Sequence, residues 1–192
     1  TVRASHDTKE FDVTSSDTQI LVPVDFSKGS NRAIVQAEQL AKALGAQAIL
    51  HCGDLVAPST LHAIVGFGLP IHMIHGNNTG DLYYLSKWAQ DPKNRLHYHG
   101  QDGSLVLAER RIFMVHYPHY AKAMALTGDF DLVCNGHEHR AVIERIRNIR
   151  GSETLRIDPG SVAGVSAATT YVFGDLQTLE FEIRPVPGYE NK

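Results

Sequence analysis

The sequence has few cysteines, no excess of basic residues and no long apolar run. Two cysteines among 192 residues cannot form a disulfide framework, which is typical of a reducing compartment, so we expect a cytoplasmic protein. The formal net charge of -3 shows no excess of positive charge, so we expect no nucleic-acid binding that depends on overall charge. No apolar run approaches the ~18 residues of a membrane-spanning helix, so no membrane partner is expected. Soluble enzymes and binding modules remain.

The chain has enough apolar residues for one substantial core, and it is rich in histidine. A length of 192 residues with 43% hydrophobic content is typical of a single domain. Histidine occurs 11 times, and several of these residues stand next to glycine or aspartate. We expect a polar N-terminal tail or peripheral segment at residues 1–18, the domain at 19–187, and a C-terminal tail at 188–192.

Strand and helix patterns alternate in the first half of the chain. Short apolar runs bounded by turn residues predict strands at 20–25, 47–51 and 69–74. Helical spacing predicts helices at 30–44, from Pro58 to about 65, and from the end of the GNNTGD stretch to about residue 89. From residue 96 the pattern changes to short strands separated by turns, with one helix near 119–127. Two βαβ units followed by a strand-rich half predict two packed sheets covered by helices.

Five short stretches place metal-binding types of side chain where strands are predicted to end. They are VPVD, HCGD, HGNN, MVH and NGHEH, which supply Asp25, Asp54, Asn77, His116, His137 and His139. Loops at the carboxyl ends of strands converge on one edge of an α/β sheet, so these residues can meet. If the GHEH turn is extended, His137 and His139 point the same way. The mixed nitrogen and oxygen set suits Mn²⁺, Fe, Zn²⁺ or similar ions, and Asp54 could bridge two of them.

Each stretch taken alone also has an ordinary structural explanation. A single histidine is more often a surface or hydrogen-bonded residue than a ligand, and GD and GNN are common turn sequences. The occurrence of all five stretches in this order, each at a predicted strand end, favours a metal site.

From about residue 46 to 185 the sequence resembles the calcineurin-like metallophosphoesterase superfamily, in particular its small single-domain bacterial and archaeal phosphodiesterases. The family pattern runs DxH, GD, GNxD or GNHE, H and GHxH, followed by an NPGS-like turn. The matching stretches here are HCGDL, HGNNTGD, MVHYPH, NGHEHR and IDPGSV. The resemblance implies an α/β fold, a four-layer αββα sandwich of two mixed β-sheets flanked by helices.

The resemblance also implies a site with two divalent ions, which we expect to be Mn²⁺, with Fe, Zn²⁺ and Ni²⁺ as alternatives. A hydroxide held between the ions would attack the phosphorus of a small phosphoester substrate and hydrolyse a phosphodiester bond. The implied ligands of the first ion are Asp25, Asp54 and His139. The implied ligands of the second ion are Asp54 (bridging), Asn77, His116 and His137.

Two positions depart from the family pattern. Ser27 stands where the DxH motif has a histidine ligand, so we expect the first position to bind its ion weakly. Asn78 stands where many relatives carry a histidine thought to protonate the leaving group. An amide cannot act as that acid, although it can hydrogen-bond a phosphate oxygen. His119, three residues after His116, could reach the substrate from the start of a helix.

The segment of residues 19–46 has a second resemblance. ILVPVDFSKGSNRAIVQAEQLAKALGA, within residues 19–46, is similar to the first strand and helix of universal stress proteins, whose aspartate lies at a nucleotide site. The later glycine-rich phosphate loop of their nucleotide-binding members has no match here. Three functions therefore remain open. They are a metal-dependent phosphoesterase, a catalytically weakened relative that acts as a binding or scaffold protein, and a nucleotide-binding module. The sequence leaves the substrate open, and it is compatible with a homo-oligomer.

Overall fold

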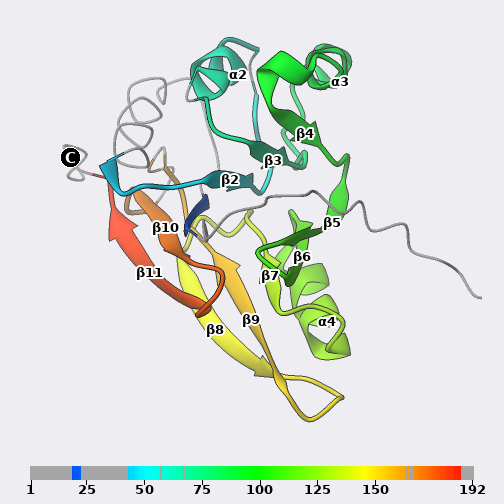
Figure 1. Cartoon of the computed structure of the whole chain (residues 1–192), viewed down its shortest axis with the longest axis vertical. Coiled ribbons are helices and arrows are strands. Elements are labelled where there is room, and N and C mark those ends of the chain that lie inside the picture. The colour runs from blue at the N-terminus through cyan, green and yellow to red at the C-terminus, as the bar shows by residue number, and fades with distance from the viewer. Residues whose placement is uncertain are drawn as a thin grey trace, which may run out of the picture.

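The computed structural model describes residues 19–22, 43–56, 58–66, 68–162, 164 and 167–186. The first of two sheets (Figure 1) contains β1 (Gln19–Val22), β2 (Ala48–His51), β3 (Ile71–Met73), β4 (Leu96–Tyr98), β10 (Thr170–Asp175) and β11 (Glu180–Pro185). Its strand order is β11-β10-β1-β2-β3-β4. The strands β1 to β4 are parallel to one another, whereas β10 is antiparallel to both β1 and β11. This sheet is therefore mixed.

The second sheet is also mixed. It contains β5 (Asp102–Leu107), β6 (Arg110–Val115), β7 (Leu132–Cys134), β8 (Val142–Arg147) and β9 (Glu153–Asp158). Its strand order is β5-β6-β7-β9-β8. The central strands β6, β7 and β9 are parallel, and the strands at the two edges, β5 and β8, are antiparallel to their neighbours. Parallel central strands in both sheets bring several strand carboxyl ends to one side of the molecule.

Three helices and one 3-10 turn complete the described part of the chain: α2 (Pro58–Val65), α3 (Leu82–Ala89), η1 (Pro92–Asn94) and α4 (Pro118–Thr127). Local sequence explains where two of them begin. The carboxylate of Asp81 accepts a hydrogen bond from the backbone N–H of Tyr84 at 2.9 Å and caps α3. Pro118 occupies the first turn of α4, where a missing backbone donor costs nothing.

Side-chain alternation along the strands produces four layers. Ile49 on β2 belongs to the core beneath α2 and α3, whereas its neighbour Leu50 belongs to the core between the sheets. On β6, Met114 faces the core between the sheets, and Phe113 packs in the cluster that includes Ala121 of α4. Thus α2 and α3 cover the outer face of the first sheet, and α4 covers the outer face of the second (Figure 1). The predicted αββα sandwich is confirmed.

The predicted elements agree closely with those observed. All three expected helices within the described residues are present, and the run GSLVLAERRIFMVH folds as the β5–β6 hairpin. The expected helix 30–44 falls almost wholly outside the described residues, as do the two tails, Asp25 and Ser27, so these stay predictions. No helix in the described part combines the length and the apolar character that a membrane span requires.

Candidate metal centre

Four of the candidate ligands converge where strands of both sheets end. Asp54 follows β2 and Asn77 follows β3, both in the first sheet. His116 follows β6 and His137 follows β7, both in the second sheet. We call these four residues the ligand cluster. It lies at the junction of the two sheets, so residues that are more than 80 positions apart in the sequence can act on one ion.

The spacing of the ligand cluster suits one ion. The Oδ1 atom of Asn77 lies 2.9 Å from His116 Nε2 and 2.9 Å from His137 Nδ1. The two imidazole nitrogens are 3.2 Å apart, and Asp54 Oδ1 lies 3.4 Å from His116 Nε2. Neighbouring ligands of an octahedral or tetrahedral ion, each about 2.1 Å from it, lie about 3.0 or 3.4 Å apart. No group of three His, Cys, Asp or Glu side chains in the described residues can hold an ion by itself, so the set depends on the Asn77 amide.

The tautomer of His116 is set by its surroundings. Its Nδ1 atom lies 2.8 Å from the carbonyl oxygen of Cys52, which can only accept, so Nδ1 carries the proton. Burial lowers the pKa of His116, whose ring is 2% exposed. The imidazole is therefore neutral near pH 7, and Nε2 presents a lone pair to the cluster. A carbonyl partner on the other ring nitrogen is the usual support of a metal-binding histidine.

The contact between His116 and Asn77 tests whether an ion fits the cluster. With Nδ1 protonated, His116 Nε2 is an acceptor, and the Asn77 oxygen 2.9 Å away is also an acceptor. Two lone pairs that face each other at this distance repel, and the Asp54 carboxylate adds negative charge beside them. A cation between these atoms would turn the repulsion into coordination. The residues present therefore fit a divalent ion with nitrogen and oxygen ligands.

The remaining predicted site residues have different surroundings. His139 lies close enough to influence His116 electrostatically, since a charge on His139 would lower the pKa of His116. Asn78 binds Asp54 through its backbone N–H at 2.9 Å and its side-chain amide at 3.0 Å. That amide orients the carboxylate, and its predicted contact with a phosphate oxygen stays a prediction. His119 is exposed in the first turn of α4, with its ring beside Tyr117 and Tyr120.

The conformation of the GHEH loop differs from the extended form considered in the sequence. His137 has φ 79 and His139 has φ 55, so both occupy the left-handed region. The condition for the expected alternation, an extended turn, is therefore not met. Asp54 is also left-handed, with φ 59. Left-handed non-glycine residues are strained, and such strain is concentrated at functional sites.

Two glycines allow the backbone to approach the ligands. A Cβ atom on Gly76 would lie 2.1 Å from Asp54 Oδ1 and 2.7 Å from the His116 ring. A Cβ atom on Gly53, where φ is +110, would lie 2.6 Å from His116 Nδ1. Real Cβ contacts are never this short, so HCGD and HGNN require glycine at these positions.

Tyr117 is a site residue that the sequence reasoning missed. Its ring centroid lies 4.8 Å from that of His137 and 5.3 Å from that of His116. With His116 it forms part of the wall of a cavity of about 150 Å³, here called the side cavity. The tyrosine directly follows His116 in the sequence, and this adjacency was the available signal.

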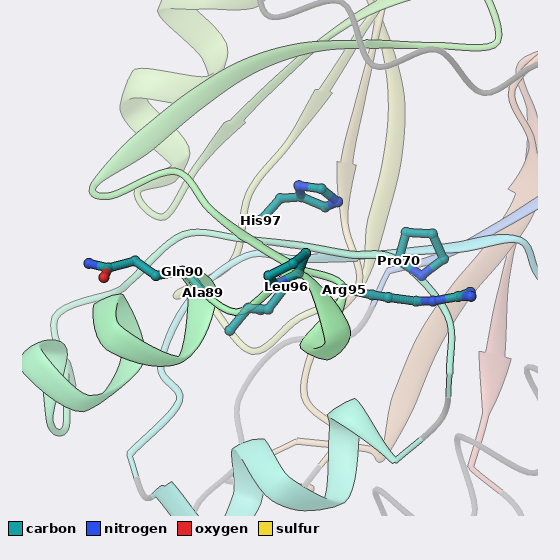
Figure 2. Close-up of a pocket in the computed structure, with 7 residues that line it drawn as sticks. Pro70, Ala89, Gln90, Arg95, Leu96 and His97 are labelled. Atoms are coloured by element: carbon teal, nitrogen blue, oxygen red, sulfur yellow. The ribbon is translucent and has the colours of Figure 1, made fainter.

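A larger cavity of about 370 Å³, here called the distant cavity, is lined by other residues (Figure 2). It opens near the amino ends of β3 and β4, whereas the ligands follow the carboxyl ends of strands. Its wall includes Pro70, Ala89, Gln90, Arg95, Leu96 and His97. Because no candidate ligand lines this cavity, we assign it no part in the chemistry despite its larger size.

A buried polar network supports the GHEH loop from below. Arg156, 1% exposed on β9, donates from Nε to Asn135 Oδ1 at 2.8 Å and from Nη1 to Glu144 at 2.6 Å. Asn135, directly before the loop, donates to the Asp158 carboxylate at 2.8 Å. Burial has the largest influence on the Asp158 carboxyl and raises its pKa to about 6.

This raised pKa predicts a pH-dependent stability. The folded state binds the Asp158 proton more tightly than the unfolded state, whose pKa is near 3.8. Its contribution is thus complete below pH 3.8 and is lost as the pH rises through about 6. A difference of about 2 pKa units corresponds to about 3 kcal/mol. Urea unfolding should therefore show the wild type losing about 3 kcal/mol relative to Asp158→Asn between about pH 4 and pH 7. A pH-independent difference between the two proteins would contradict the prediction.

Comparisons with known proteins point to one family. The family model of the calcineurin-like phosphoesterase superfamily domain matches residues 19–179. The match includes the segment 19–46, so the resemblance of that segment to universal stress proteins is not favoured as an account of the chain.

Individual relatives are similar over most of their length. The phosphodiesterase MJ0936 of Methanocaldococcus jannaschii is 27% identical over 142 residues, which cover 73% of this chain and 81% of the relative. A structure of an archaeal phosphodiesterase has a TM-score of 0.77 at 22% identity and covers 87% of this chain and 99% of its own. Vacuolar protein sorting 29 from Cryptosporidium parvum has a TM-score of 0.59 at 13% identity, with coverages of 87% and 95%. The two structures show a common fold.

Proposed function

We propose that this chain, which belongs to the calcineurin-like phosphoesterase superfamily, hydrolyses phosphodiester bonds of a small substrate with divalent ions bound at the ligand cluster. Calcineurin-like phosphoesterases use a dinuclear divalent metal centre. The observation that carries the proposal is the approach of four ligand side chains from two sheets, with the lone pairs of His116 and Asn77 facing each other. Their mixed nitrogen and oxygen character favours Mn²⁺, with Fe, Zn²⁺ and Ni²⁺ as alternatives.

The first ion position completes the proposed centre. We assign it Asp25, Asp54 and His139, with Asp54 shared by both ions. Asp25 and Ser27 lie outside the described residues. The support for this position is the nearness of His139 to His116 and the match of the family model over residues 19–46. Because Ser27 replaces an imidazole, this position should bind its ion more weakly than the ligand cluster does.

When bound, the ions would supply Lewis-acid stabilisation of the phosphoryl oxygens and a nucleophile generated from water near neutral pH. The residues of the chain supply orientation and bury one side of the cluster, since Asp54 and His116 are buried whereas Asn77 and His137 are exposed. Asp54 and His116, each 2% exposed, are removed from bulk water, which strengthens the electrostatic interactions in the site. Asn78 fixes both oxygens of Asp54. It has no proton to give to a leaving group, so substrates with good leaving groups should be preferred.

Hydrolysis of bis(p-nitrophenyl) phosphate tests the proposed function. Protein that has been freed of metal with a chelator should be inactive, and added Mn²⁺ should restore release of p-nitrophenol. Mg²⁺, Zn²⁺ and Ni²⁺ should be assayed alongside to rank the ions. Turnover that persists in excess chelator, or no turnover with any divalent ion, would contradict the proposal.

Restoring the missing ligand should strengthen the first position. The lack of one imidazole ligand should lower the affinity of the first position for its ion by at least ~10–100-fold, the range known for the loss of partners that only support a ligand. The wild type should therefore need millimolar Mn²⁺ for full activity, and Ser27→His should shift the midpoint of metal activation to lower concentration. Ser27→Ala serves as the matched control. An unchanged midpoint in a normally folded Ser27→His protein would mean that Asp25 is not a ligand.

A further inference from the structure

The side cavity opens directly beside the ligand cluster. His116 belongs to both, because its ring lines the cavity while its Nε2 atom points into the cluster. The cavity holds about 150 Å³, whereas pockets that enclose a whole drug-sized ligand begin at about 300 Å³. A cavity of about 150 Å³ is large enough for a single six-membered ring. It can therefore receive one substituent of a substrate whose phosphate lies at the cluster.

The wall of the side cavity combines aromatic and polar groups. Tyr117 and Val115 at the end of β6 provide apolar surface, and Gly76 adds no side chain. The other wall residues, His75, Thr79 and Gln101, carry hydrogen-bonding side chains. A plain hydrocarbon ring would leave these polar groups without a partner when it displaced water. A heterocyclic ring with donors and acceptors on its edge would satisfy them.

The polar groups are available to a ligand. His75 is held in place because its Nδ1 atom is hydrogen-bonded to the hydroxyl of Tyr98 and its backbone N–H donates to Gly100. Within the described residues, no hydrogen bond is formed by His75 Nε2 or by the side chains of Thr79 and Gln101. One side of the cavity thus presents an imidazole nitrogen, a hydroxyl and an amide. Together they can form hydrogen bonds with both donors and acceptors of a ligand.

From the size and the lining we infer that the side cavity binds a single-ring nucleobase, so that the substrate is a phosphodiester in which one alcohol is a pyrimidine nucleoside. This inference rests on the proposed function, because it places the phosphate at the ligand cluster. The base lies against the Tyr117 side of the cavity, and the edge of the base meets Gln101, Thr79 and His75. A purine, with two fused rings, takes up more of the same space and leaves less room for the sugar.

Binding to the metal-free protein tests the inference without relying on turnover. Chelator-treated protein should be titrated with uridine 5′-monophosphate, adenosine 5′-monophosphate and ribose 5-phosphate, and affinity should be measured by calorimetry. A base in contact with an aromatic ring should make the pyrimidine nucleotide bind at least about 10-fold more tightly than ribose 5-phosphate. The purine nucleotide should show less of this gain. Amide chemical shifts of Gly76, Gln101 and Tyr117 should move with uridine 5′-monophosphate.

Two variants test whether the added affinity for the base comes from the side cavity. Gln101→Ala removes one hydrogen bond to the base and should weaken uridine 5′-monophosphate by about 3- to 10-fold, with little change for ribose 5-phosphate. Gln90→Ala, at the wall of the distant cavity (Figure 2), is the matched control and should change neither affinity. Equal affinities for the pyrimidine nucleotide and ribose 5-phosphate would overturn the inference, as would equal effects of the two variants.

Failure of the inference can be told apart from failure of the proposed function. If bis(p-nitrophenyl) phosphate is hydrolysed with Mn²⁺ while bases add no affinity, the site is a phosphodiesterase without a base pocket, and the inference is wrong. If bases add affinity but no diester is hydrolysed with any divalent ion, the pocket stands and the proposed function is wrong.

Discussion

His116→Ala should lower kcat/KM for bis(p-nitrophenyl) phosphate by at least about 100-fold and remove the ion from the ligand cluster. The imidazole is 2% exposed, it is fixed in one tautomer by the carbonyl of Cys52, and it touches Asn77, His137 and Asp54. Its loss removes one of four ligands and opens a gap at the junction of the two sheets. Loss of a partner that merely supports a ligand already lowers metal affinity or activity by about 10- to 100-fold. Loss of a ligand should therefore lower both by more. Metal content by elemental analysis and kcat/KM should fall together.

His97→Ala is the matched control for that experiment. His97 lies on β4, where its ring stacks on His72 at 4.7 Å, and it lines the distant cavity (Figure 2). Its removal should leave metal content and kcat/KM within about 3-fold of the wild type, because surface and edge substitutions away from special features have small effects. Equal losses in both variants would refute the assignment of His116 as a ligand.

Gly76→Ala should lower kcat/KM by about 100-fold although it adds only one methyl group. The new Cβ atom would lie 2.1 Å from Asp54 Oδ1 and 2.8 Å from the Asp54 backbone nitrogen. Relief of these contacts requires the carboxylate to move by about 1 Å, and a displacement of that size can reduce a rate by about 100-fold. Overpacking should also lower the free energy of unfolding by about 1–3 kcal/mol.

Gly151→Ala separates the steric effect from a general effect of replacing glycine. Gly151 lies in the turn between β8 and β9, where an added Cβ would meet nothing within 4 Å. Its φ of +80 means that alanine is strained there by about 1–2 kcal/mol. Gly151→Ala should therefore lose stability and keep its activity below the unfolding temperature. If Gly76→Ala retains wild-type kcat/KM, Gly76 does not protect the position of Asp54.

Much of the fold was predictable because the signals were local. Pro58 and Gly128 mark helix ends, and the apolar runs of β2, β3, β6 and β7 are short and bounded by turn residues. The convergence of four candidate ligands was predictable for the same reason, since Asp54, Asn77, His116 and His137 each directly follow or closely follow a strand. Parallel strands then bring their carboxyl ends to one edge whatever their separation in the sequence.

The features that could not be predicted depend on tertiary contacts. Nothing local shows that the Asn78 amide is directed at Asp54, or that the carbonyl of Cys52 fixes the tautomer of His116. The left-handed φ of His137 has no local signal in the sequence, although histidine adopts this region more often than most residues do. The side cavity is likewise built by segments from both sheets, so Gln101 carries no recognisable signal alone, and Tyr117 has only its adjacency to His116.

A crystal structure of the protein grown with Mn²⁺, with anomalous diffraction recorded at the manganese edge, tests the central claim most directly. We predict an anomalous peak within the ligand cluster, about 2.1 Å from His116 Nε2, His137 Nδ1, Asn77 Oδ1 and a carboxylate oxygen of Asp54. A second, weaker peak should share Asp54. Crystals in millimolar Mn²⁺ that show no peak at the cluster, or manganese bound only elsewhere, would contradict the account.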